Sequence, residues 1–139
     1  MGKVIKLTKI FTFDAAHFLP EHQGKCAAMH GHTYRLEVTV VRQNKLLISG
    51  GSSDGMVIDF FDLNTVVMDE VINNIDHKVL NDIYPFRTTA ENVGAHIFDL
   101  LTDKLLRHGV TVERIKLWET PDACVEVWHD CGIVSDNRI

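Results

Sequence analysis

The chain has 139 residues with 45% hydrophobic and 24% charged content, and it carries a formal net charge of −5. This length suits one domain with a single core, which we expect to span residues 1–139. The negative charge argues against nucleic acid or an anionic membrane as the main partner, and no apolar run approaches the roughly 20 residues that a membrane span needs. Because the N-terminus also lacks the continuous apolar stretch of a secretory signal, we expect a cytoplasmic protein.

Two strands are expected near the start of the chain, at residues 3–17 and 30–42, because apolar and polar residues alternate along both. The apolar face of the first strand ends at His17. The corresponding face of the second strand begins with His30 and His32. If these strands are antiparallel neighbours, all three histidines meet at one end of the sheet.

The middle of the chain begins with turn-forming residues and continues into a helical pattern. Residues 48–55 are rich in glycine and serine, and a short strand is expected at 56–61. A helix is then expected from an N-cap at Asp62 to about Asn74, because its apolar residues recur with helical spacing.

The last third of the chain combines a second helix with two further strands. The segment Thr88-Thr89-Ala90-Glu91 fits a capping box that opens this helix, and Gly109 is a suitable stop. Strands are expected at 111–120 and 123–129. The order ββααββ predicts an α+β domain in which two helices cover one face of a four-stranded antiparallel sheet.

The segment His30-Gly31-His32 has the spacing of a metal site on a strand, since residues two apart project to the same side. Two such imidazoles can reach one zinc ion at the roughly 2.0–2.1 Å that Zn–N bonds need, and His17 is the expected third ligand. Three protein ligands leave an open position, which is typical of catalytic zinc rather than structural zinc. The alternative is that the His-x-His spacing arose by chance.

Cys26 lies four residues before His30 and directly after Lys25. A thiol beside a divalent cation and a lysine is expected to have a lowered pKa, so Cys26 is a candidate general base or nucleophile. The alternative is a small buried hydrophobic residue, which is the commonest role of a free cysteine.

Six segments together resemble the 6-pyruvoyltetrahydropterin and 6-carboxytetrahydropterin synthase family, and they occur in the same order along nearly the whole chain. They are Phe13-x-Ala15-x-His17, Cys26-x-x-x-His30-Gly31-His32, Gly55-Met56-Val57-x-Asp59-Phe60-x-Asp62-Leu63, Asp76-His77-x-x-Leu80-Asn81, Thr89-x-Glu91-Asn92 and Glu119-Thr120. Any one of these segments is weak evidence, but all six in order are specific.

The resemblance implies a tunnelling fold (T-fold) that assembles into a homo-hexamer of two trimers, with active sites at subunit interfaces. It implies that zinc is the cofactor and that 7,8-dihydroneopterin triphosphate is the substrate. Cys26 is then the general base, tuned by Asp76 and His77 of a neighbouring subunit, and Glu119 anchors the pterin ring.

The short gap between Cys26 and His30 resembles the 6-carboxytetrahydropterin synthase branch, which serves queuosine and deazapurine biosynthesis. The pyruvoyl-forming branch of biopterin synthesis has a longer gap. Thr88, however, stands where many bacterial members have proline, and in this respect the chain resembles the pyruvoyl-forming branch. Two alternatives therefore remain: a 6-pyruvoyltetrahydropterin synthase, or a non-catalytic zinc-binding assembly module with the same fold.

Three further residues are candidates for substrate contact, although each has an ordinary structural explanation. Thr89 and Glu91 belong to a matching segment, but Glu91 fits helix capping equally well. Lys25 is the nearest cation for the triphosphate, and solvated lysines are common. Glu119 ends an apolar strand face, where a carboxylate requires a partner because burying an unpaired charge is costly.

Overall fold

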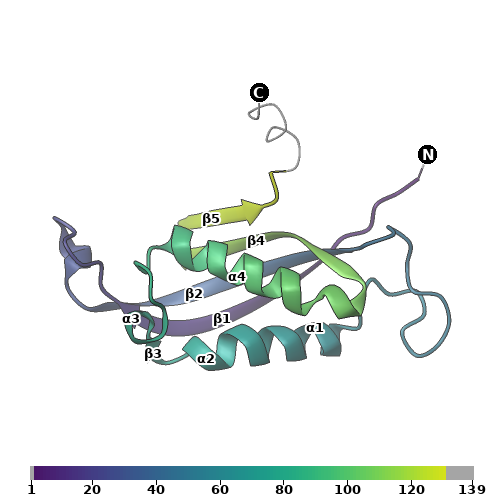
Figure 1. The fold of residues 1–139 in the computed structure, drawn as a ribbon, viewed down its shortest axis with the longest axis horizontal. Helices are drawn as coiled ribbons and strands as arrows, with labels where there is room; N and C mark the ends of the chain where they lie inside the picture. The colour runs from purple at the N-terminus through teal and green to yellow at the C-terminus, as the bar shows by residue number, and fades with distance from the viewer. Residues whose placement is uncertain (1, 131–139) are drawn as a thin grey trace.

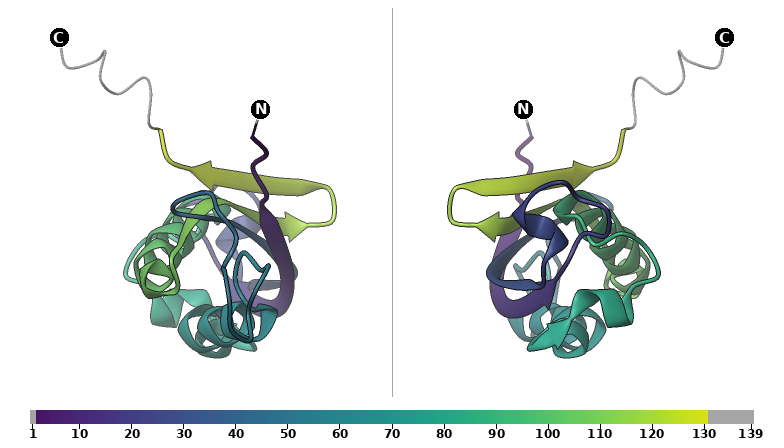
Figure 2. Two further views of the ribbon diagram at one scale, coloured as in Figure 1. Left: turned by 90° about the vertical axis from the view of Figure 1, so that its right-hand side faces the viewer. Right: turned by 90° about the vertical axis from the view of Figure 1, so that its left-hand side faces the viewer.

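The computed structural model describes residues 2–130, and within them one curved sheet is covered on a single face by helices (Figure 1). The strand order is β3-β1-β2-β4-β5. The strands are β1 (Leu7–His17), β2 (His30–Arg42), β3 (Lys78–Val79), β4 (Val110–Thr120) and β5 (Ala123–Trp128). The end-on views show the sheet curving around the helices (Figure 2). The α+β class and the placement of the helices are confirmed.

The sheet has five strands rather than the expected four, because a two-residue strand follows the first helical segment. This strand, β3, runs parallel to β1 and pairs Lys78 with Ala15 and Val79 with Ala16. Two residues are too short to show an alternating pattern, so sequence periodicity could not reveal them. The remaining pairs of neighbouring strands are antiparallel.

The first helical segment starts earlier than expected and runs without a break to Ile75. It consists of α1 (Phe60–Val67), the π-helical η2 (Met68–Ile72) and α2 (Asn73–Ile75). The N-cap is Asp59, whose side chain accepts a hydrogen bond from the Phe61 N–H at 2.7 Å. The expected N-cap at Asp62 and the expected short strand at 56–61 are therefore wrong, because residues 57 and 58 form a bend and Asp59 begins the helix.

The second long helix, α4 (Ala90–Lys104), begins one residue later than the capping box predicts. Thr89, not Thr88, is the N-cap, and its Oγ1 accepts a hydrogen bond from the Asn92 N–H at 3.1 Å. The Thr88–Glu91 capping box is therefore wrong. After the 3₁₀ turn η3 (Leu106–His108), Gly109 takes a left-handed conformation with φ of 73°, which confirms it as the stop.

Smaller differences concern the ends of strands and two short helical elements. The first strand begins at Leu7 rather than at residue 3, and β5 ends at Trp128 rather than at residue 129. Two elements that periodicity did not indicate are the 3₁₀ turn η1 (Lys25–Ala27) and the short helix α3 (Leu80–Ile83). Both of them follow a strand that ends near the histidines.

The core lies between the helices and the inner face of the sheet, and the strand register continues this inner face into the histidine group. Leu36, Val38 and Leu117 are fully buried on the sheet side, and Leu63 and Leu101 are fully buried on the helix side. In residues 2–130, no helix combines the length and the apolar character needed to cross a membrane.

Candidate metal centre and active site

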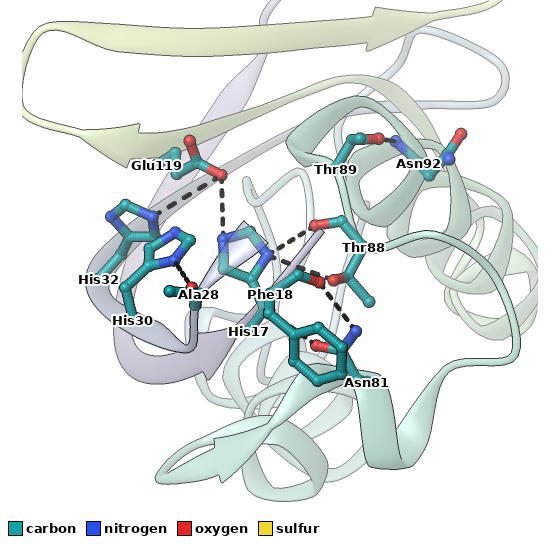
Figure 3. Close-up of polar contacts among 10 residues, drawn as sticks. All are labelled: His17, Phe18, Ala28, His30, His32, Asn81, Thr88, Thr89, Asn92 and Glu119. Carbon is teal, nitrogen blue, oxygen red and sulfur yellow. Dashed lines mark hydrogen bonds and ion pairs between the residues drawn. The ribbon is translucent and has the colours of Figure 1, made fainter. Parts of the chain in front are cut away.

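Three histidines come together where the inner face of the sheet ends (Figure 3). His17 is the last residue of β1 and pairs in register with His30, the first residue of β2, while His32 pairs with Ala15 on the same face. Each histidine offers a nitrogen that lies within 4.8 Å of those of the other two. The structure thus brings together the three residues that the alternation pattern predicted to meet.

Hydrogen bonds to the backbone orient two of the three rings. Nδ1 of His17 lies 2.8 Å from the Thr88 carbonyl oxygen, and Nδ1 of His30 lies 2.8 Å from the Ala28 carbonyl oxygen. Because a carbonyl only accepts, each Nδ1 carries the hydrogen, and the lone pair of a neutral ring is then at Nε2. This arrangement is the one in which a histidine is ready to bind a metal through Nε2.

Two of these nitrogens are buried and have no hydrogen-bond partner in the described part of the chain, namely Nε2 of His17 and Nε2 of His32. His17 is only 1% exposed. An unpaired buried nitrogen costs roughly 1–3 kcal/mol, so a metal ion that takes up these lone pairs fits the donor set. Burial lowers the pKa of both His17 and His32, which favours the neutral form that ligates metals.

Glu119 reaches the histidine group from β4, the strand that pairs with β2 on the side away from β1. Its Oε2 lies 3.7 Å from Nε2 of His17 and 4.0 Å from Nε2 of His32. The pairing of β4 with β5 shifts between Trp118 and Thr120, so Glu119 is the extra residue of a β-bulge. A bulge of this kind redirects a side chain. Here the bulged residue is Glu119, whose carboxylate lies beside Nε2 of His17 and Nε2 of His32.

Tyr34 lies on the same face of β2, two residues beyond His32. Its ring centroid is 5.5 Å from that of His32 and 6.3 Å from that of His17. The hydroxyl is buried and unpaired within residues 2–130, and burial together with the nearby Glu119 raises its pKa. Tyr34 therefore adds a protonated phenol to the inner wall of the site.

Thr88 is a residue of this site that sequence reasoning missed. It is fully buried, and its Oγ1 lies 3.2 Å from Nδ1 of His17 in addition to the carbonyl contact. The sequence pattern assigned Thr88 to a capping box, and only the folded chain shows its contact with His17.

Replacing Thr88 with valine is expected to lower zinc affinity by less than about tenfold. This is a small effect for the loss of a side chain that hydrogen-bonds a metal ligand. Valine keeps the shape of threonine and the backbone carbonyl at 2.8 Å, so His17 retains its main acceptor. Zinc competition with a chromophoric chelator measures this. Complete loss of zinc binding would instead show that the hydroxyl is the acceptor that orients His17.

Cys26 and Lys25 lie in η1, between the end of β1 and the start of β2. Cys26 is half-buried and Lys25 is exposed. The Cys26 carbonyl accepts a hydrogen bond from the Leu19 N–H at 2.7 Å, which folds this loop back toward the end of β1. The structure thus places Cys26 on a loop that both begins and ends at a histidine of the group, and its role as a base stays a prediction.

Asp76 and His77 form a separate group within one chain. Nδ1 of His77 lies 3.0 Å from Oδ1 of Asp76, and the same carboxylate oxygen accepts a hydrogen bond from the Asp14 N–H at 2.9 Å. This bond, followed by the contacts with His77, lowers the pKa of Asp76. Because Asp14 is exposed on the face of β1 opposite His17, the structure does not bring this pair to the histidines of its own chain.

The two remaining substrate-contact candidates lie at the start of α4. Thr89 uses its hydroxyl as the N-cap, as described above, and Glu91 is exposed in the first turn. An acidic residue in the first turn is favourable because of the helix dipole, which accounts for Glu91 without a ligand. Their contact with a substrate stays a prediction.

The family model of 6-pyruvoyl tetrahydropterin synthase matches residues 6–130. The chain belongs to this family. It is 34% identical over 144 residues to the 6-carboxy-5,6,7,8-tetrahydropterin synthase of Haemophilus influenzae, covering 88% of this chain and 98% of that protein. It is 42% identical over 96 residues to the protein of the same name from Synechocystis sp., covering 68% and 73%.

The fold comparison agrees with this family membership. The structure of Caenorhabditis elegans 6-pyruvoyl tetrahydropterin synthase superposes with a TM-score of 0.74 at 23% identity, covering 94% of this chain and all of that chain. At this level of identity the match supports the fold alone, and it confirms the expected T-fold.

Proposed function

We propose that this protein is a zinc-dependent 6-carboxy-5,6,7,8-tetrahydropterin synthase. In this reaction 7,8-dihydroneopterin triphosphate and one water molecule give 6-carboxytetrahydropterin, acetaldehyde and triphosphate, as a step toward queuosine and other deazapurines. Family membership and the names of its relatives support a lyase of the tetrahydropterin synthase type. The observation that carries the proposal is the group of three histidines whose free nitrogens converge beside the Glu119 carboxylate.

His17, His30 and His32 would hold the zinc ion, since all three offer nitrogen ligands and two have backbone acceptors that fix the ring. Three neutral ligands leave the ion its full positive charge and an open position. When bound there, zinc supplies Lewis-acid chemistry that polarises the oxygens of the substrate side chain.

Each residue near this centre has a role in the proposal that its chemistry supports. Glu119 accepts hydrogen bonds from the ring N–H and exocyclic amine of the pterin, two donors that match the two oxygens of a carboxylate. Cys26 takes a proton from the substrate side chain, as a general base. Asp76 and His77 relay protons, and they come from a neighbouring copy because their own chain holds them on the opposite face of β1.

The carboxy product is favoured over the pyruvoyl product by two observations. The relatives from Haemophilus influenzae and Synechocystis sp. carry the name of the carboxy enzyme. In addition, only three residues separate Cys26 from His30, and this short spacing resembles the carboxy branch. We further propose that the protein is cytoplasmic and forms a homo-hexamer built from two trimers. Light scattering coupled to gel filtration tests the number of subunits.

Incubation of the purified, zinc-loaded protein with 7,8-dihydroneopterin triphosphate tests this function, with the products identified by mass. Acetaldehyde together with 6-carboxytetrahydropterin supports the proposal. Formation of 6-pyruvoyltetrahydropterin would place the protein in the biopterin branch. Unchanged substrate despite bound zinc would overturn the catalytic proposal and favour a zinc-binding assembly module.

Replacing Glu119 with glutamine is expected to lower kcat/KM by about 10- to 100-fold while zinc stays bound, because a charged hydrogen-bond acceptor is lost and the shape is kept. Glu126→Gln is the matched control, since Glu126 is exposed on β5 and faces Arg114 at 3.4 Å. Steady-state kinetics and zinc content of both variants measure this. Loss of zinc from Glu119→Gln would identify Glu119 as a metal ligand rather than a pterin anchor.

A further inference from the structure

Asn81 holds the backbone of the residue that follows His17. Its Oδ1 accepts a hydrogen bond from the Phe18 N–H at 3.0 Å, and its Nδ2 donates one to the Phe18 carbonyl at 2.9 Å (Figure 3). Both bonds are partly shielded from solvent. One side-chain amide therefore satisfies both backbone groups of Phe18 just beyond the last paired residue of β1.

The residues after Phe18 are tied in turn to the loop that contains Cys26. The Leu19 N–H donates to the Cys26 carbonyl at 2.7 Å, and Nη2 of Arg87 donates to the Pro20 carbonyl at 3.2 Å. Only one peptide unit separates the residue held by Asn81 from the residue bonded to Cys26. A shift of Phe18 would therefore move both His17 and the backbone of Cys26.

Asn81 is itself on a firm support. It lies in α3 directly after Leu80, which is fully buried in the core, and α3 follows β3, which pairs with β1. The amide thus projects from an element that the core fixes, and it holds a loop that few regular backbone bonds stabilise. Such a support is what precise placement of a reacting group requires.

We propose that Asn81 is a positioning residue that sets where Cys26 lies relative to the metal centre. The proposal rests on the proposed function insofar as Cys26 acts as a base there. An amide suits this task because it offers one donor and one acceptor to the two backbone groups of a single residue, whereas alanine offers neither. Asn81 itself touches the backbone of Phe18 and is not a catalytic residue.

Asn81→Ala tests this proposal, with Asn74→Ala as the matched control. Asn74 also makes two hydrogen bonds, to the Asp69 and Glu70 carbonyls, but it is exposed on α2 and is not part of the site. The first measurement is the alkylation rate of Cys26 by iodoacetamide in metal-free protein, followed by peptide mass. Exposed Cys124 serves as the internal reference.

In Asn81→Ala, Cys26 is expected to alkylate about fivefold faster or more, because two hydrogen bonds that restrain its loop are gone. In the zinc-loaded enzyme, kcat should fall by about 10- to 100-fold with little change in KM, since a displaced base slows the proton transfer and leaves pterin binding intact. Asn74→Ala should match the wild type in both measurements.

A folded Asn81→Ala protein with wild-type alkylation of Cys26 and wild-type kcat would overturn the proposal. If this variant does not fold, Asn81→Asp keeps an acceptor for the Phe18 N–H and removes the donor to the Phe18 carbonyl, and unchanged alkylation of Cys26 there overturns it equally. Wild-type turnover tests the proposed function separately. If the wild type leaves the substrate unchanged, that function fails, whereas the alkylation comparison still decides the role of Asn81.

Discussion

His32→Ala is expected to lower zinc affinity by more than about 100-fold, because it removes a metal ligand. Removing only an outer hydrogen-bonding partner of a metal ligand lowers affinity by roughly 10- to 100-fold. The substitution removes one of three nitrogens that lie within 4.8 Å of one another. Zinc at a hundred times its Kd should stabilise the wild type by about 2.7 kcal/mol, and the variant should lose this gain. Thermal unfolding with zinc and with a chelator, together with zinc content, measures both effects.

The fold should survive this substitution, because His32 is only partly buried and its Nε2 has no protein partner in the described residues to lose. His96→Ala is the matched control: His96 is exposed on α4 and contacts Tyr84 and Phe86 instead. Turnover should vanish with the zinc in His32→Ala and persist in the control. Retention of zinc at wild-type affinity in His32→Ala would contradict the metal centre.

Cys26→Ala is expected to lower kcat by about 10²- to 10⁴-fold, the range that a positioned general base contributes. Zinc content should not change, because the three histidines supply the ligands without the thiol. Cys124→Ala is the matched control, since Cys124 is a free thiol exposed on β5. Steady-state turnover and zinc content of the two variants give the comparison.

Two outcomes would contradict the assignment of Cys26 as a base, and they point in different directions. Loss of zinc from Cys26→Ala would make the thiol a fourth metal ligand. Turnover equal to that of the wild type would return Cys26 to its alternative role as a small, half-buried residue of η1.

Local signals in the sequence were sufficient for the long strands and insufficient for the helix starts. Alternation predicted both long strands of the first third because their buried faces carry large apolar residues at every second position. Capping was less decisive where two candidates compete. Asp59 and Asp62 both precede an apolar stripe, as Thr88 and Thr89 both precede α4, and in each pair only the chain's path through the core selects the N-cap.

The sequence alone determined the histidine group, because side chains two apart on a strand share a face and antiparallel neighbours bring strand ends together. The order of the six matching segments was likewise enough to indicate the family. Both features depend on local geometry and on the order of residues along the chain, which the sequence contains directly.

Only the tertiary structure decided what surrounds that group. Thr88 meets His17 across 71 positions of sequence, and Asn81 meets Phe18 across 63. The separation of the Asp76–His77 pair from the histidines likewise follows from the β1–β3 pairing. Contacts of this kind depend on how α3 and the segment before α4 lie beside the end of β1, and packing of distant elements leaves no periodic trace in the sequence.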